Sequence, residues 1–261
     1  IYSNNAGTLM DRNLGAVSAT PGDPGALGLY YQWGRKDPFV GSAAIGVYTP
    51  KKTTYKWPGM VESNESRGTI EYSIEHPTTY IYGYPDWLYI SSSGNNRWNH
   101  SKTIYDPCPP GWRVPDESVW VNAGLTYGSF DTSNKGLTFT GGVDNNAWYP
   151  ASGYLGYNYP TVTNIGSYGY YWSCGNGNYD NYKGSLEVYN NGWRSTSDLC
   201  ELALPVRCQK DESYNSSNVP TVVIDSIATA TSTSAEIFAN IPYSGWSDIT
   251  ERGIIYSTSP D

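Results

Sequence analysis

The stretch YDPCPPGWRVP, residues 105–115, combines one cysteine and one tryptophan with closely spaced prolines. Proline lacks the backbone donor and biases the residue before it towards an extended conformation. Residues 106–110 therefore cannot form a helix or a central strand, and we expect a fixed corner. Cys108 lies inside this corner, so a disulfide to a distant cysteine would hold a large part of the chain in place.

Four cysteines allow three disulfide connectivities, and the sequence alone does not choose among them. They are Cys108, Cys174, Cys200 and Cys208. Their spacing favours a nested pattern, Cys108 with Cys208 and Cys174 with Cys200, because a bridge from Cys200 to Cys208 would bend the strand-like run ALPVRCQ, residues 203–209. The alternative is four reduced, buried thiols. No CxxC pair or Cys/His cluster indicates zinc, so we expect no metal site.

Five runs follow one another along the first 210 residues: MDRNLGA (10–16), GLYYQWGRKDPF (28–39), YDPCPPGWRVP (105–115), YYWSCG (170–175) and ALPVRC (203–208). In this order they resemble the Fibrobacter succinogenes major paralogous domain of Bacteroidetes surface proteins, a branch of the C-type-lectin-like superfamily. The resemblance implies an α+β fold in which a long disulfide joins an early element to the last strand and an inner one closes the loop region.

The sequence predicts two domains. Residues 1–210 would form the C-type-lectin-like domain, and the polar residues 211–220 a linker. Residues 221–261 alternate with period two and look like the start of a fibronectin-type-III-like β-sandwich. Such a sandwich needs about seven strands, so we expect either that the protein continues beyond Asp261 or that another chain completes the sheet. We likewise expect a leader, a lipoprotein cysteine or an upstream domain before Ile1.

The first domain is predicted to combine short strands, one or two helices and long loops. A helix is expected over residues 26–33, where apolar residues recur at helical spacing, and another over residues 116–124, which begin acidic and end on glycine. A helical turn is expected at residues 85–89. Strands separated by Gly and Asn turns are expected within residues 2–14, 136–142, 147–154, 169–174, 183–190 and 202–209.

The composition is rich in amphipathic aromatic residues, since the chain holds 25 Tyr and 10 Trp but only 4 Phe and 2 Met. Tyr and Trp bury a ring while the polar tip stays hydrated, which suits a β-rich recognition protein. The net charge of −8 disfavours nucleic acid, whose binding depends on Lys and Arg neutralising phosphates. No run of 18 or more apolar residues occurs, so we expect no membrane span in this sequence.

The cysteines and histidines bear on location and catalysis. Paired cysteines indicate an oxidising compartment, and with the family resemblance this predicts an extracellular protein, secreted or at the cell surface. His76 and His100 lie near no recognisable Ser or Cys nucleophile arrangement, so we expect no enzymatic activity.

Tyr, Asn, Asp and Trp concentrate on turns between the predicted strands in the later part of the first domain. Rings give a large contact area and amides adapt their hydrogen bonds, as in antibody paratopes. We therefore expect a glycan or protein ligand to bind here, through Tyr157, Tyr159, Asn178, Tyr179, Asp180, Tyr182 and Trp193. The alternative is that Asn and Gly only form turns and Tyr only covers surface; the next candidate surface is then residues 40–99.

No cofactor is expected, although Asp144, Asp180 and Glu187 could supply oxygens to a Ca²⁺ ion. The EPN and WND calcium motifs of sugar-binding C-type lectins are absent. Two classes of function remain open. One is a non-enzymatic ligand-binding or adhesin module, and the other is a structural or assembly subunit of a surface appendage, an outer-membrane complex or a phage tail fibre, with a neighbouring subunit as its partner.

Overall fold

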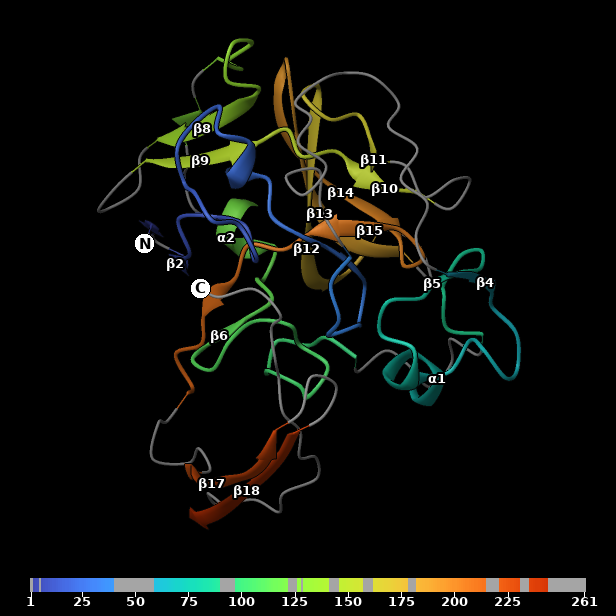
Figure 1. Cartoon of the computed structure of the whole chain (residues 1–261). Coiled ribbons are helices and arrows are strands. Elements are labelled where there is room, and N and C mark those ends of the chain that lie inside the picture. Colours follow the sequence, from blue (N-terminus) through green and yellow to red (C-terminus); the bar gives the residue numbers. More distant parts are fainter. Residues whose placement is uncertain are drawn as a thin grey trace. The chain divides into compact units, whose positions relative to one another are not determined.

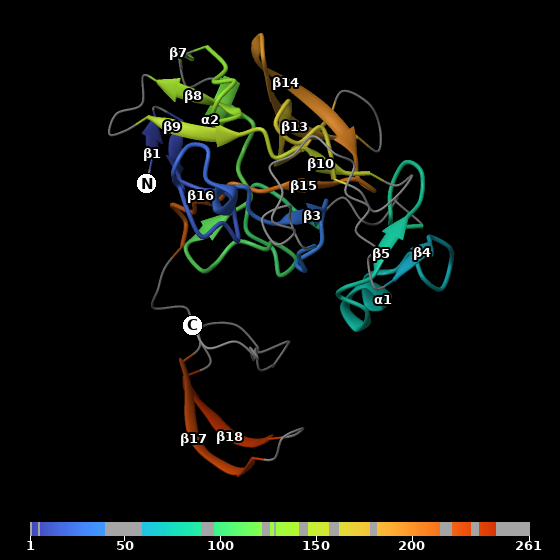
Figure 2. The same cartoon turned by 45° about the horizontal axis from the view of Figure 1, so that its top comes forward.

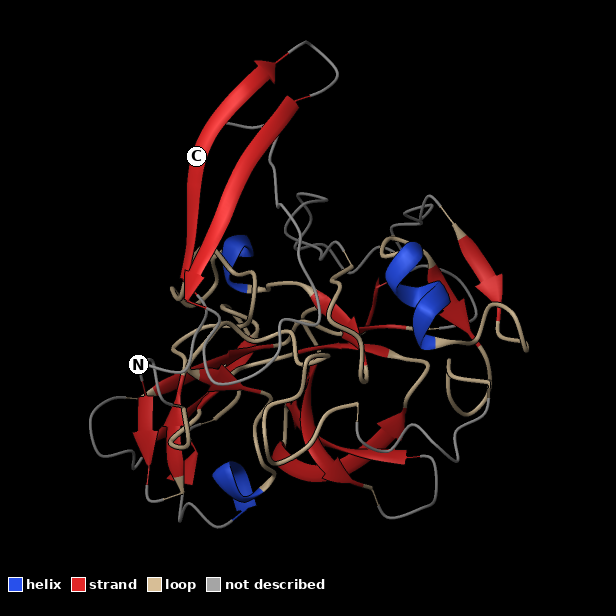
Figure 3. Ribbon diagram, turned by 90° about the horizontal axis from the view of Figure 1, so that it is seen from below, coloured by secondary structure: helices blue, strands red, loops and turns tan. Residues whose placement is uncertain are grey.

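The computed structural model describes residues 2–4, 6–39, 59–89, 97–121, 126–127, 129–140, 146–156, 162–177, 182–214, 221–230 and 235–243. The chain divides into two compact units, Ile1–Asp211 and Glu212–Asp261. Within the described residues, small β-sheets dominate and the two α-helices are short, in agreement with the α+β class (Figures 1 and 3).

Two four-stranded sheets bring the start and the end of the first unit together. The strand order of one sheet is β1 (Tyr2–Asn4), β2 (Gly7–Leu9), β16 (Gln209–Lys210) and β6 (Trp112–Arg113). The order of the other is β11 (Val162–Thr163), β10 (Tyr154–Leu155), β15 (Ala203–Pro205) and β3 (Tyr30–Gln32). The segment 203–210 therefore contributes one strand to each sheet, β15 to the second and β16 to the first.

Smaller sheets and short helices complete the first unit. The sheets are β7 (Thr126–Tyr127) with β8 (Gly136–Thr140) and β9 (Ala147–Pro150); β12 (Tyr168–Asn176) with β13 (Tyr182–Tyr189) and β14 (Gly192–Leu199); and the parallel pair β4 (Met60–Glu62) with β5 (Tyr80–Tyr82). The helices are the 3-10 helix η1 (Pro24–Ala26), α1 (Ile70–Glu75) and α2 (Ser118–Val121). Figures 1 and 2 show α1, β4 and β5 grouped on one side of the unit.

The core forms where the β12–β14 sheet packs against β8 and β9. Leu186 and Val188 of β13 are fully buried in one cluster with Phe139 and Tyr149. Side chains alternate along a strand, so Glu187 lies on the opposite face of the sheet. A second cluster contains Trp33, Trp98 and Trp172 together with the four cysteines.

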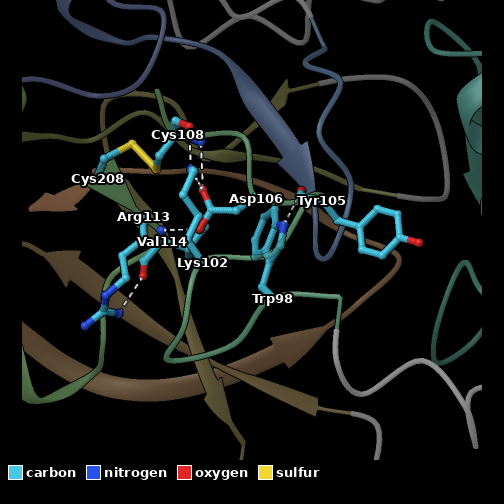
Figure 4. The surroundings of a disulfide bond; sticks show 8 residues. All are labelled: Trp98, Lys102, Tyr105, Asp106, Cys108, Arg113, Val114 and Cys208. Carbon is cyan, nitrogen blue, oxygen red and sulfur yellow. Dashed lines mark hydrogen bonds and ion pairs between the residues drawn. A yellow bond between two sulfur atoms is a disulfide. The ribbon is translucent and has the colours of Figure 1, made fainter. Parts of the chain in front are cut away.

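The corner at residues 105–115 is held by a buried aspartate as well as by its prolines. Asp106 Oδ1 accepts from Cys108 N at 2.8 Å and from Lys102 Nζ at 3.0 Å, and its Oδ2 accepts from Val114 N at 2.8 Å (Figure 4). The predicted disulfide between Cys108 and Cys208 is confirmed, and it joins residues 100 positions apart. The corner is therefore tied to the closing segment by a covalent bond and organised internally by one carboxylate.

The predicted inner disulfide between Cys174 and Cys200 is wrong, because both residues are buried thiols. Cys174 lies in β12, Cys200 follows β14, and β13 runs between these strands. Neighbouring strands lie about 4.8 Å apart, so two strand spacings give roughly 10 Å, whereas a disulfide requires Cα atoms within about 7 Å.

The helix predicted over residues 26–33 does not form. The 3-10 helix ends at Ala26, Gly28 adopts a φ of +75°, and β3 then pairs with β15. A Cβ at Gly28 would lie 2.7 Å from Asn13 Cβ, so the turn requires glycine. All three β3 residues are buried, and a short strand that is buried on both faces cannot be distinguished from a buried helix by periodicity.

Other predicted elements are present in altered form. The strand predicted over residues 202–209 is interrupted after Pro205, and β15 and β16 belong to different sheets. The predicted strand within residues 2–14 is the hairpin β1–β2. Residues 85–89 form bends instead of a helical turn, and the helix of this region is α1, where the Thr69 side chain accepts from Tyr72 N at 3.0 Å. The helix predicted over residues 116–124 is represented by α2.

The second unit contains the antiparallel hairpin of β17 (Thr221–Ala230) and β18 (Ala235–Tyr243). Residues 244–261 lie outside the described residues, so the fibronectin-type-III-like sandwich stays a prediction. In neither unit do the described residues include a helix with the length and apolar character needed to cross a membrane.

Candidate ligand-binding site

The structure describes two of the seven predicted ligand-binding residues and does not bring them together. Tyr182 begins β13 opposite Leu199, whereas Trp193 of β14 lies opposite Val188. Positions 182 and 188 are therefore separated by roughly 20 Å along the strand. Trp193 packs against the core, with its ring 5.7 Å from that of Phe139. Outside the described residues lie Tyr157, Tyr159, Asn178, Tyr179 and Asp180.

Of the three predicted calcium ligands, the structure describes only Glu187. This carboxylate pairs with the Arg194 guanidinium across β13 and β14. Asp144 and Asp180 lie outside the described residues, so the calcium site stays a prediction.

A hollow of about 600 Å³ opens beside β4 and β5. Glu62 and Ser63 line it at the end of β4, residues 82–89 except Trp87 line it after β5, and Glu201 lines it from the turn that follows β14. These segments are distant in the sequence, and Figure 2 shows β4 and β5 side by side. The lining of this hollow combines aromatic rings with carboxylates.

The loop that follows β5 is fixed by close backbone contacts. Ser63 N donates to Tyr82 O and Ser63 Oγ donates to Trp87 O, each at 2.7 Å. A Cβ at Gly83 would lie 2.5 Å from Ser63 Cβ, so only glycine lets the two segments approach this closely. Side chains carried by the loop are therefore held on a defined backbone.

A buried ion pair anchors the same loop to the core. Asp86 Oδ1 accepts from Arg97 Nη1 and from Leu88 N, both at 3.0 Å, and a second contact joins Asp86 Oδ2 to Arg97 Nη2. The Arg97 guanidinium lies 5.0 Å from the Trp33 ring and 4.9 Å from the Trp87 ring. The carboxylate of Asp86 is already paired, so the remaining acidic groups of the lining are Glu62, which is exposed, and Glu201, which is 1% exposed.

Glu201 is held in the hollow by three hydrogen bonds. Its backbone carbonyl accepts from Tyr80 OH at 2.5 Å and from Gln32 Nε2 at 2.8 Å, and its Oε2 accepts from Gly83 N at 3.0 Å. Its Oε1 is buried and has no hydrogen-bond partner among the described residues. Burial raises the pKa of Glu201, the Gly83 N–H opposes that rise, and the nearby Asp86 charge adds to it. A buried acceptor without a donor is costly, so a ligand donor that reached Glu201 Oε1 would be bound favourably.

Two exposed rings flank these acidic groups. The side chains of Tyr84 and Tyr89 are 76% and 52% exposed, and both line the hollow. Large exposed rings beside a few fixed polar groups are typical of small-ligand sites. The described lining contains no Lys or Arg, so the chemistry suits a neutral or amino-bearing ligand and disfavours an anion.

Local sequence patterns indicate only part of this site. The run YIYGYPDWLY, residues 80–89, combines four tyrosines with Gly, Pro and Asp, a composition similar to that of the later turns for which ligand binding was predicted. Glu201 lies more than a hundred residues away and stands in no motif. Tertiary contacts place it at the hollow: the pairing of β3 with β15, and the hydrogen bonds from Gly83 N, Tyr80 OH and Gln32 Nε2.

Among the described residues, one group of three could supply ligands to a metal ion: His100, Asp116 and Cys174, whose ligand atoms all lie within 4.8 Å of one another. The group lies outside the hollow's lining.

Comparison of the chain with family profiles, curated protein sequences and solved structures finds no match. The function is therefore inferred from the residues of this chain.

The Glu201→Gln variant is expected to be more stable than the wild type at pH 7, with the difference vanishing near pH 4. A carboxyl whose folded pKa is raised contributes its full stability below its unfolded pKa and loses it as the pH rises through the folded pKa. Glutamine does not titrate, so it avoids that loss and can still accept from Gly83 N. Melting temperatures of both proteins from pH 4 to 8 measure the difference, and a difference that is constant with pH would contradict the buried carboxyl.

Proposed function

We propose that the protein is an extracellular, non-enzymatic ligand-binding or adhesin module that recognises a glycan at the hollow beside β4 and β5. One observation carries the proposal. The buried Glu201 Oε1 has no hydrogen-bond partner among the described residues, and Glu201 lines the same hollow as the exposed rings of Tyr84 and Tyr89. A saccharide offers hydroxyl donors for the carboxyl group and apolar C–H faces for the rings.

The hollow is also rigid in the way that weak ligands require. Each saccharide contact contributes little binding free energy. Binding is therefore measurable only if association costs little entropy through the ordering of loops and side chains. Ser63 and the Asp86–Arg97 pair fix the loop, and Tyr80 and Gln32 fix the backbone of Glu201. We therefore assign the site to neutral or amino-bearing sugar units, since uronic or sialic acids would place a negative charge beside Glu62 and Glu201.

The wider setting is part of the same proposal. The Cys108–Cys208 disulfide supports an oxidising, extracellular location. The resemblance of residues 1–210 to the Fibrobacter succinogenes major paralogous domain supports membership of the C-type-lectin-like superfamily, followed by a fibronectin-type-III-like module. The alternative, a structural or assembly subunit of a surface appendage, an outer-membrane complex or a phage tail fibre, predicts association with a neighbouring subunit and no saccharide binding.

Replacing residues of the hollow is expected to weaken glycan binding while the fold survives. A glycan array on the purified protein identifies a saccharide, and calorimetry then measures its affinity for Tyr84→Ala, Tyr89→Ala and Glu201→Gln. We expect each variant to lose about tenfold, which corresponds to about 1.4 kcal/mol. Both tyrosine rings are exposed, so their loss should leave the melting temperature nearly unchanged.

The matched control is Tyr214→Ala, an exposed tyrosine outside the hollow, which should bind as the wild type does. Recovery of intact saccharide after incubation would agree with the absence of catalysis. Wild-type affinity in both tyrosine variants and in Glu201→Gln would move the site elsewhere. An array without any signal, together with self-association or capture of a neighbouring subunit, would favour the alternative.

A further inference from the structure

Three segments far apart in the sequence bring His100, Asp116 and Cys174 together. Cys174 N donates to Pro115 O at 2.9 Å, which ties β12 to the residue before Asp116. Asp116 N donates to Gln209 Oε1, also at 2.9 Å. The position of Asp116 is thus fixed by the same closing segment that carries the disulfide cysteine Cys208.

The three ligand atoms lie close enough together to share one metal ion. Cys174 Sγ lies 3.2 Å from Asp116 Oδ1 and 3.7 Å from His100 Nδ1, and His100 Nδ1 is in direct contact with Asp116 Oδ1. With Zn–S near 2.3 Å and Zn–N or Zn–O near 2.0–2.1 Å, two ligand atoms at the tetrahedral angle are separated by about 3.5 Å. Small side-chain shifts would bring all three atoms to that spacing.

The surroundings orient these ligands and leave room for a fourth. The Arg113 guanidinium pairs with Asp116 Oδ2, so Oδ1 is the oxygen that faces His100 and Cys174. Outer contacts of this kind commonly orient metal-bound carboxylates. A hollow of about 550 Å³ lies in front of the group and is lined by His100, Asp116, Glu117 and Asn176, among others. Water or a ligand atom would have space to complete the coordination.

We infer that His100 Nδ1, Asp116 Oδ1 and Cys174 Sγ bind one divalent cation of the zinc class. A thiolate, an imidazole and a carboxylate form a donor set that suits Zn²⁺ and disfavours Ca²⁺ and Mg²⁺, which take oxygen ligands. On binding, the thiol proton passes to solvent and the sulfur lone pair forms the bond to the metal, so no oxidant or reductant is needed. The expectation of no metal site rested on the absence of local ligand spacing, whereas these ligands converge only through the fold.

Co²⁺ is the probe, because its spectrum reports both the ligand type and the geometry. The untagged, metal-depleted full chain, with its disulfide intact, is titrated with Co²⁺. We expect saturation at one equivalent, a thiolate-to-cobalt charge-transfer band and d–d bands of tetrahedral intensity. Zn²⁺ should displace Co²⁺, and a large excess of Ca²⁺ should not.

His100→Ala is the decisive variant, because its side chain is 72% exposed and its loss should leave the fold intact. We expect it to weaken Co²⁺ binding at least tenfold. His76→Ala is the matched control, since the chain contains two histidines and His76 lies outside the group. Cys174→Ser should abolish the charge-transfer band, and Cys200→Ala should retain it.

The inference fails if the wild type shows no charge-transfer band. It also fails if His100→Ala and His76→Ala bind Co²⁺ equally, or if the band follows Cys200 instead of Cys174.

Discussion

Replacing Cys108 and Cys208 together by alanine is expected to lower the free energy of unfolding by about 4–5 kcal/mol. The bond joins residues 100 positions apart, and the chain-entropy model assigns about 4.7 kcal/mol to a loop of about 100 residues. Since a domain is stable by only about 5–15 kcal/mol, this loss would leave the first unit near its unfolding threshold. Denaturant unfolding followed by tryptophan fluorescence measures the change.

Cys200→Ala is the control, because it removes a buried sulfur without opening a disulfide. Its loss in free energy of unfolding should be that of a small core truncation, well below the loss caused by the double replacement. Peptide mapping without reductant should find Cys108 linked to Cys208, with Cys174 and Cys200 alkylated only after unfolding. A loss below about 1 kcal/mol in the double variant, or a peptide that links Cys174 to Cys200, would contradict the disulfide assignment.

Replacing Arg97 by alanine is expected to cost about 3–5 kcal/mol, because it leaves the Asp86 carboxylate buried without its cation. The side chains of Arg97 and Asp86 are 2% and 4% exposed, and the guanidinium also lies against the rings of Trp33 and Trp87. Arg97→Lys keeps the charge and loses the bidentate contact, so its cost should be intermediate. Denaturant unfolding of the two variants measures both costs.

The exposed pair of Arg12 and Asp11 is the matched control, with side chains 40% and 44% exposed. Arg12→Ala should cost no more than about 1 kcal/mol, as exposed pairs do. The double variant Asp86→Asn with Arg97→Met should lose less than Arg97→Ala alone, because it leaves no buried charge. Equal costs for Arg97→Ala and Arg12→Ala would show that the Asp86 pair does not anchor the loop.

Local sequence signals were reliable where one segment decides its own conformation. The prolines of residues 105–115 predicted the corner. The pairing of Cys108 with Cys208 was favoured because a bridge between Cys200 and Cys208 would bend the strand-like residues 203–209. The role of Asp106 in organising that corner was not predicted, although its position two residues before Cys108 places its carboxylate near the Cys108 backbone N–H. Predictions from local patterns were wrong where other segments of the chain bury the residues. Residues 26–33, for example, form a turn and a buried strand instead of the predicted helix.

The candidate sites depend on contacts that no local pattern encodes. Glu201 reaches the hollow because β15 pairs with β3 and because Gly83 N donates to its carboxylate. Cys174 meets His100 and Asp116 because β12 is bonded to Pro115. The inner disulfide was predicted from spacing along the chain, and the strand β13 that separates its cysteines could not be placed from that spacing.

The most direct test of glycan recognition is a ¹H–¹⁵N NMR titration of the protein with the saccharide selected on the array. We expect the largest shift changes at Glu62, Ser63, Glu201 and the residues from 82 to 89 other than Pro85, and we expect these changes to weaken in Glu201→Gln. Shift changes centred on Tyr182 or Trp193, with residues 82–89 unaffected, would contradict the assignment of the ligand to this hollow.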